Sequence, residues 1–100
     1  MEATQDQTER ISNAVINYMN DNSNLLPPMI FQSSETFNHV VHIGTNILMA
    51  KWDILPYPPG DFVRCITNND LSGTFGRADS INKKCIEFYV TLMYNLGYIE

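Results

Sequence analysis

The sequence has few cysteines, few basic residues and no long apolar run, and each shortage excludes a class of protein. Its two cysteines, Cys65 and Cys85, fall in apolar helical patterns, which fits reduced, packed thiols better than a disulfide framework. No apolar run approaches the ~18 residues that span a bilayer, and the polar first ten residues do not resemble a signal peptide. We therefore expect a cytoplasmic protein without membrane attachment.

Acidic side chains outnumber basic ones. Six Lys and Arg against eleven Asp and Glu give a net charge of −5. Residues 1–50 hold one basic and five acidic side chains, a net charge of −4, whereas residues 51–100 hold five and six, a net charge of −1. An acidic chain repels phosphate backbones, so direct nucleic-acid binding is disfavoured.

Apolar residues make up 44% of the 100 residues, which is typical of a folded chain and predicts one domain over residues 1–100. Three stretches repeat apolar residues with the 3.6-residue period of an amphipathic helix. The first contains Ile11, Ala14, Val15, Tyr18 and Met19; the second contains Phe37, Val40, Val41, Gly44, Ile47 and Leu48; the third contains Ile81, Cys85, Phe88, Tyr89, Leu92, Met93 and Leu96.

Each stretch carries a start signal for a helix. Thr8 or Asp6 is positioned to cap the first helix, Ser33 and Ser34 precede the second, and Asp79 or Ser80 precedes the third. In the second helix, Gly44 lowers the stability of the helix by about 1 kcal/mol relative to Ala. We expect this glycine to let another helix approach closely.

Proline-rich segments separate these helices. The apolar segment 25–31 (LLPPMIF) is predicted to pack across the helices, and segment 54–59 (ILPYPP) to form a stiff corner. The corner should fold a short helix, 61–67, back onto the last helix, which places Phe62, Ile66, Tyr89 and Leu92 in one core. A further short helix, 71–77, follows Asp70. No segment alternates as a strand should, so we predict a small all-α bundle of three main helices with short connecting helices.

The region from Pro58 to Asn95 also carries a recognisable pattern. It reads Pro-Pro-Gly-x-Phe, then Asn-Asp-Leu, then a small residue and Ala-Asp-x-x-Asn, then an apolar helix ending in Tyr-Asn. This pattern resembles that of a widespread group of small phage and prophage proteins. Its elements here are Pro58, Pro59, Gly60, Phe62, Asn69, Asp70, Leu71, Gly76, Ala78, Asp79, Asn82, Tyr94 and Asn95. The resemblance implies origin and fold rather than an activity.

Polar residues gather around two predicted helix starts. Asn69, Asp70, Asp79 and Asn82 could form a small ligand pocket, with Arg77 available for an anion. The alternative is capping, because Asp and Asn satisfy the free N–H groups of helix starts, and two carboxylates would oppose an anion. We favour capping. Lys83 and Lys84, at the start of the last helix where cations are electrostatically unfavourable, are further anion-binding candidates beside a solvated-face interpretation.

No catalytic or metal-binding constellation is evident. His39 and His42 lack a third ligand at zinc-site spacing, and Cys65 lacks a base at recognisable spacing. Residues 72–77 (SGTFGR) match no phosphate-binding loop. We therefore predict no enzyme, no metal and no cofactor.

The leading hypothesis is a non-enzymatic binding protein that inhibits or modulates a host factor, such as an antiphage defence complex, by occluding a protein surface. Its predicted partner-binding residues are acidic: Glu2, Asp6, Glu9 and Asp21. One alternative is sequestration of a small nucleotide through Arg77, Lys83 and Lys84. Another is a structural or assembly protein that self-associates through segment 25–31. A DNA-binding regulator is the least favoured, because of the charge.

Overall fold

A computed structural model describes all 100 residues, and it confirms the all-α prediction. The chain forms six α-helices and two 3₁₀ turns, with no strand. The elements are α1 (Gln5–Asp21), η1 (Ser23–Leu25), η2 (Pro28–Phe31), α2 (Ser34–Lys51), α3 (Asp61–Thr67), α4 (Leu71–Arg77), α5 (Ser80–Lys84) and α6 (Ile86–Asn95).

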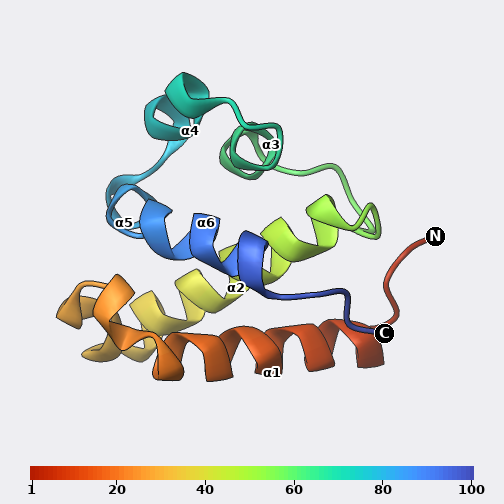
Figure 1. Ribbon diagram of the computed structural model, residues 1–100, viewed down its shortest axis with the longest axis horizontal. Helices are drawn as coiled ribbons and strands as arrows, with labels where there is room; N and C mark the ends of the chain where they lie inside the picture. Colours follow the sequence, from red (N-terminus) through yellow and green to blue (C-terminus); the bar gives the residue numbers. More distant parts are fainter.

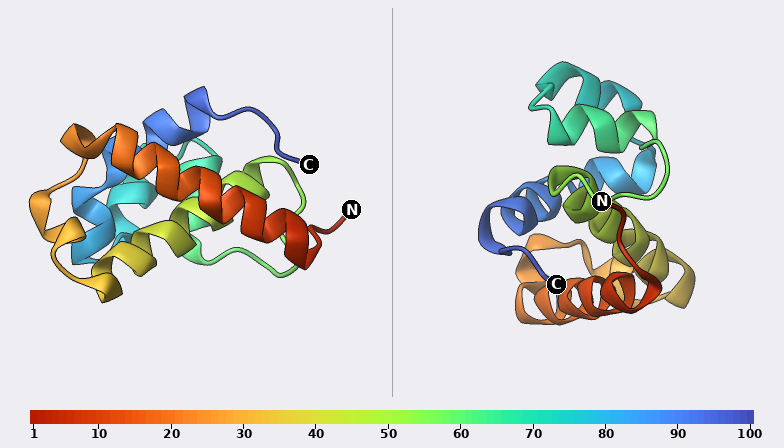
Figure 2. Two further views of the ribbon diagram at one scale, coloured as in Figure 1. Left: turned by 90° about the horizontal axis from the view of Figure 1, so that it is seen from below. Right: turned by 90° about the vertical axis from the view of Figure 1, so that its right-hand side faces the viewer.

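The helices form three levels. Figure 1 shows α1 along one face of the molecule, α3 and α4 at the opposite face, and α2 and α6 between them; the right-hand view of Figure 2 shows the same order. Helix α2 is the centre of the arrangement because it contacts α1, η2, α3 and α6. Helix α4 packs chiefly against α3, which leaves its other sides without a large helix contact.

Helix α1 begins earlier than expected. The predicted caps, Thr8 and Asp6, lie inside the helix, and the residue that caps it is Thr4, whose Oγ1 accepts a hydrogen bond from the Gln7 N–H at 3.1 Å. The signal for this cap is local, because Thr4 and Gln7 match the Ser/Thr-x-x-Glu/Gln pattern of a helix start. The Ala3 N–H also donates to the Ile54 carbonyl at 2.8 Å, which anchors the chain before the helix. The buried stripe of α1 contains Ile11, Val15 and Met19, as its periodicity predicts.

Helix α2 begins after Ser33, whose hydroxyl accepts hydrogen bonds from the two N–H groups of Glu35 and Thr36. Its Gly44 lies where three helices meet. A methyl group at Gly44 would lie 3.0 Å from Val15 Cγ1 on α1 and 3.2 Å from Leu92 Cδ2 on α6. Since ordinary carbon contacts are about 3.5–4.0 Å, the glycine permits the close approach that we expected.

The apolar segment 25–31 is used inside the fold. It forms the end of η1 and then η2, and it buries Leu26 and Ile30 in the core. The prediction that this segment packs across the helices is confirmed. Phe31 remains partly exposed, and its ring meets that of Phe37 at a tilt of 58°, with ring centroids 5.9 Å apart.

Helices α2 and α3 end in the same way, with a residue in the left-handed region. Asp53 has a φ of 58° and Asn69 a φ of 60°. After α3, the Asp70 N–H donates to the Cys65 carbonyl at 2.9 Å and the Asn69 N–H donates to the Ile66 carbonyl at 3.4 Å. This is the Schellman arrangement, in which Asn can replace Gly. Asn69 therefore has a local structural role.

The third predicted helix is not continuous. It divides at Cys85 into α5 and α6, because the Cys85 N–H donates to Asn82, three residues back, instead of four. One tightened turn of this kind shifts the apolar stripe by less than a residue, so the 3.6-residue pattern continues across it. Regular helical bonding resumes with the Tyr89 N–H donating to the Cys85 carbonyl at 3.0 Å.

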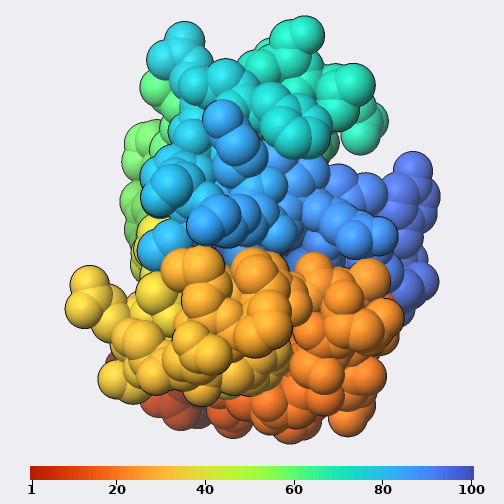
Figure 3. All heavy atoms as spheres, turned by 90° about the vertical axis from the view of Figure 1, so that its left-hand side faces the viewer, coloured from red at the N-terminus to blue at the C-terminus, as the bar shows by residue number.

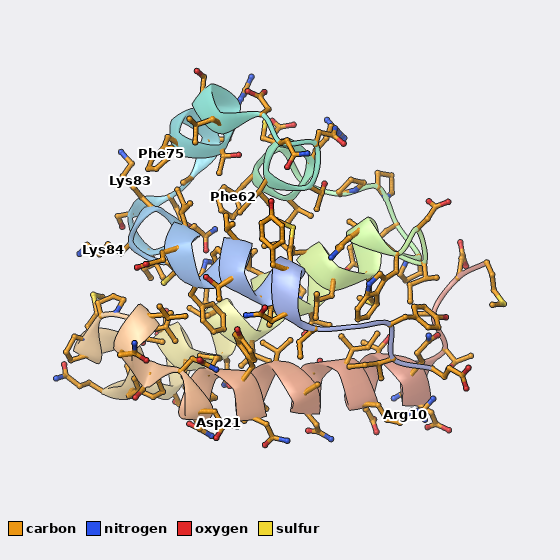
Figure 4. The ribbon with its side chains drawn as sticks, in the orientation of Figure 1. Arg10, Asp21, Phe62, Phe75, Lys83 and Lys84 are labelled. Carbon is orange, nitrogen blue, oxygen red and sulfur yellow. The ribbon has the colours of Figure 1, made fainter.

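The core joins the short helices to α6. Phe62, Ile66, Tyr89 and Leu92 belong to one buried cluster, as predicted. The rings of Phe62 and Tyr89 meet edge to face with centroids 5.8 Å apart. Figure 4 shows Phe62 pointing from α3 into the interior, towards α6. This contact holds the α3–α4 pair on top of α6.

Candidate functional site

Large apolar side chains remain exposed where α4 overhangs α6. On α4, Leu71 is 72% exposed and Phe75, one helical turn later, is 46% exposed. On α6, Tyr94 is 83% exposed. Single exposed apolar residues are normal, but an adjoining group of them marks an interaction surface.

Leu71 and Tyr94 line a hollow of about 170 Å³. We call it the apolar groove and define it by six apolar residues, namely Ile66, Leu71, Ile86, Val90, Met93 and Tyr94. Its two polar lining residues are Asn69 and Thr74, and none of its lining residues is charged. Figure 3 shows the hollow at its upper right, where α4 (teal) projects over the end of α6 (blue).

The groove exists because α4 is held against α3. The Asp70 carboxylate caps α4 by accepting from the Gly73 N–H at 2.9 Å, and the Thr74 hydroxyl donates to the Asp70 carbonyl at 2.6 Å. Gly73 lies so close to α3 that a methyl group there would be 2.7 Å from Cys65 Sγ. The glycine therefore permits α4 to lie against α3, and a hollow remains between α4 and α6.

The apolar groove continues into a more polar hollow of about 220 Å³. The two hollows share Asn69, Met93 and Tyr94, and the second adds Thr67 and Lys51. Lys51 ends α2, and its Nζ donates a hydrogen bond to the Met93 carbonyl. An ammonium group has three N–H donors, so this contact leaves donors for a bound group.

A third hollow, of about 320 Å³, adjoins the second through Thr67 and reaches the proline corner. Its lining is more polar and includes Asp53, Tyr57 and Arg64. Tyr57 is fixed there because its hydroxyl donates to Asn46 Oδ1 at 2.8 Å. The three hollows are therefore neighbours, in an order that leads from the proline corner, past the end of α2, to the apolar groove.

The four predicted acidic residues are all exposed, but they do not form one cluster. Asp6 lies in the first turn of α1 and Asp21 is its last residue, which places them about 22 Å apart along the axis. That separation exceeds the ~8–10 Å screening length in physiological salt. Figure 4 shows Arg10 and Asp21 towards opposite ends of α1. Only Glu2, Asp6 and Glu9 lie near the same end.

The predicted anion-binding residues are also dispersed. Asn69 precedes α4 and Arg77 ends it, where the Arg77 Nη1 lies 3.5 Å from Asp61 Oδ2. Lys83 and Lys84 are exposed on α5, and Figure 4 shows them at one edge of the molecule. Asn82 is buried. The structure therefore does not gather these five side chains into one site.

Asn82 and Asp79 have structural partners. Asp79 caps α5, since its Oδ1 accepts from the Asn82 N–H at 2.7 Å. The Asn82 side chain accepts a hydrogen bond from the buried Tyr89 hydroxyl at 2.8 Å. His39 Nε2 lies 3.3 Å from Asp79 Oδ2, an ion-pair distance, but the contact does not have hydrogen-bond geometry. Helix capping explains Asp70 and Asp79, and Asp79 is the cap as expected. Asn69 and Asn82 have other structural roles, in the turn after α3 and in the hydrogen bond with Tyr89.

Neither thiol is activated. Burial, followed by the Asp79 carboxylate, raises the pKa of Cys85 to about 11. Desolvation, and after it the Asp70 carboxylate, raises the pKa of the half-buried Cys65. Both thiols are protonated at neutral pH, which is unfavourable for a nucleophile.

The two histidines do not face a common point. His39 faces Asp79, whereas His42 Nε2 lies 3.3 Å from Asn46 Nδ2 within α2. No group of three or more His, Cys, Asp or Glu side chains is arranged to hold a metal ion.

The apolar groove was not predicted from the sequence. Its α6 wall includes Val90 and Tyr94, which lie outside the apolar stripe assigned to the last helix. These additional apolar residues were the available signal, because a helix that is apolar on more than one side requires more than one covering surface. Leu71 carried no comparable signal, since one apolar residue in a short helix is ordinary.

Comparisons with protein-family models, curated proteins and solved structures found no match. None of the helices combines the length and the apolar character that crossing a membrane requires.

Proposed function

We propose that this protein is a non-enzymatic binding protein that attaches to a partner protein through the apolar groove and occludes the partner's surface. The observation that carries the proposal is the exposure of Leu71 and Tyr94 in a groove whose lining holds no charged residue. Burying such side chains contributes about 25 cal/mol per Å² of apolar surface removed from water. Aromatic side chains in well-packed pockets are also common energetic centres of protein interfaces.

The phage-type resemblance belongs to the same proposal. We infer a phage or prophage protein that acts in the host cytoplasm by inhibiting or modulating a host factor, such as an antiphage defence complex. Three residues of the quoted pattern, Asn69, Leu71 and Tyr94, line the apolar groove. The exposed positions of Leu71 and Tyr94 contribute little to the core, so their place in the pattern supports a role in binding.

The acidic end of α1 is the alternative working surface. Glu2, Asp6 and Glu9 are exposed near one end of the molecule, and the first fifty residues carry a net charge of −4. Exposed charges act mainly on the rate of encounter and are screened by salt. An acidic surface therefore predicts salt-dependent association, whereas the apolar groove predicts slow dissociation with little salt dependence.

The test is capture of a partner from a bacterial lysate by the protein and by three variants of it. The groove variant is Leu71→Ser/Tyr94→Ser. The acidic variant replaces Glu2, Asp6 and Glu9 with their amides. The matched control is Phe31→Ser, which removes a partly exposed apolar residue outside the groove.

We expect the wild type, the acidic variant and the control to capture the same stoichiometric partner, identified by mass spectrometry, and the groove variant to lose it. Retention by the groove variant with loss by the acidic variant would transfer the function to α1. Capture of the chain by itself alone would favour the assembly role, and a copurifying nucleotide would favour sequestration by Arg77, Lys83 and Lys84.

A further inference from the structure

The chemistry of the apolar groove restricts the segment that it can hold, and this inference rests on the proposed function. The walls of the groove are helices, whose interior backbone groups are already hydrogen-bonded, and the chain has no strand and therefore no free sheet edge. A bound segment would find few backbone partners there. Because an unpaired backbone group away from water is costly, the bound segment must satisfy its own backbone.

An α-helix meets this requirement, since its backbone groups bond within the segment. The groove also presents ridges of the kind that helices pack against. Ile86, Val90 and Tyr94 line the groove and repeat every four residues on α6. Rows of side chains at this spacing receive the ridges of another helix.

Charge determines the orientation of such a helix. The lining of the apolar groove holds no charged residue, whereas Lys51 lines the adjoining hollow. A carboxylate at one end of the bound helix would meet the Lys51 ammonium while the apolar stripe occupies the groove. We propose that the partner contributes an amphipathic α-helix with apolar residues at positions i, i+3 or i+4 and i+7, and with an acidic residue at the end nearest Lys51.

The test uses a display library of random 16-residue peptides selected on the immobilised full-length protein. We expect enriched peptides to share the helical apolar spacing and a terminal Asp or Glu. Synthesised without the display scaffold, the best peptide should gain helical circular dichroism on binding and lose affinity when proline is placed at its centre. The Leu71→Ser/Tyr94→Ser variant should bind it at least about tenfold more weakly.

The position of the acidic residue is tested separately. Two versions of the best peptide are compared, one with its terminal Asp or Glu and one with that residue replaced by Asn or Gln. Lys51→Gln should weaken binding of the carboxylate version by about two- to fivefold and leave binding of the amide version unchanged. An equal effect on both peptides would overturn this orientation. Tyr94→Ser alone provides a second groove variant with less change to the fold.

Other outcomes distinguish failure of the helical partner from failure of the groove as a binding site. Groove-dependent peptides that are proline-rich, or that show no helical spacing, would overturn the helix and leave the groove as a binding site. Peptides that bind the groove variants as tightly as the wild type, or no enrichment at all, would contradict binding through the groove itself.

Discussion

Replacing Gly44 with alanine has two opposite effects on the stability of the protein, and the size of each is known. In a helix interior, alanine is favoured over glycine by about 1 kcal/mol. Here the added methyl group would lie 3.0 Å from Val15 Cγ1 and 3.2 Å from Leu92 Cδ2. Overpacking of a well-packed core typically costs about 1–3 kcal/mol.

Overpacking should prevail at this position. Val15 and Leu92 are fully buried and belong to α1 and α6, so relieving the contacts requires these helices to shift. We expect a net loss of about 1 kcal/mol in the free energy of unfolding. In urea denaturation this loss would lower the midpoint by about 0.3–1 M without changing the slope.

Gly76 provides the matched control. It lies in α4, and a methyl group there would have no neighbour within 4 Å. Gly76→Ala should therefore stabilise the protein by about 0.4–1 kcal/mol, opposite in sign to Gly44→Ala. In a Val15→Ala background the Gly44→Ala change should cost less, because one of the two contacts is gone. Stabilisation by Gly44→Ala in the wild type would refute the close packing of α1, α2 and α6.

The remaining stability predictions use the same assay. Leu92→Ala should cost about 2–5 kcal/mol because Leu92 is fully buried; a loss below about 0.5 kcal/mol would mean that the core is misplaced. Asp79→Ala should cost about 0.5–2 kcal/mol, whereas Asp79→Ser should keep the cap; unchanged stability with lost partner binding would make Asp79 a binding residue. Burial raises the pKa of Cys85 from 9.0 to about 11, so the folded state holds this proton more tightly than the unfolded state. Stability should therefore fall as the pH rises from about 9 through about 11, and a flat profile there would contradict the burial of Cys85.

Local signals in the sequence predicted much of the fold. Helices α3 and α4 have their predicted bounds because Asn68, Asn69 and Asp70 end one helix and cap the next. The Thr4 cap was missed although its signal is local, because Thr4 and Gln7 match the Ser/Thr-x-x-Glu/Gln pattern of a helix start and Gln7 supplies the bonded N–H. The break at Cys85 was missed because one tightened turn hardly disturbs helical periodicity.

The apolar groove is a tertiary feature, so local signals could not locate it. It requires α4 to lie against α3, which depends on the close approach of Gly73 to Cys65, residues that belong to different helices. Capping residues were easier to predict, because their partners lie only three residues away in the sequence. This difference explains why Asp70 and Asp79 were assigned correctly and the groove was not identified.

The most direct test of the central claim is calorimetric titration of the captured partner into the wild type and the Leu71→Ser/Tyr94→Ser variant. Both residues are exposed, so each substitution should change the free energy of unfolding by no more than about 0.5 kcal/mol. Binding through the apolar groove predicts a negative heat-capacity change for the wild type and an affinity at least about tenfold weaker for the variant. Equal affinities in a folded variant would contradict the groove as the binding surface.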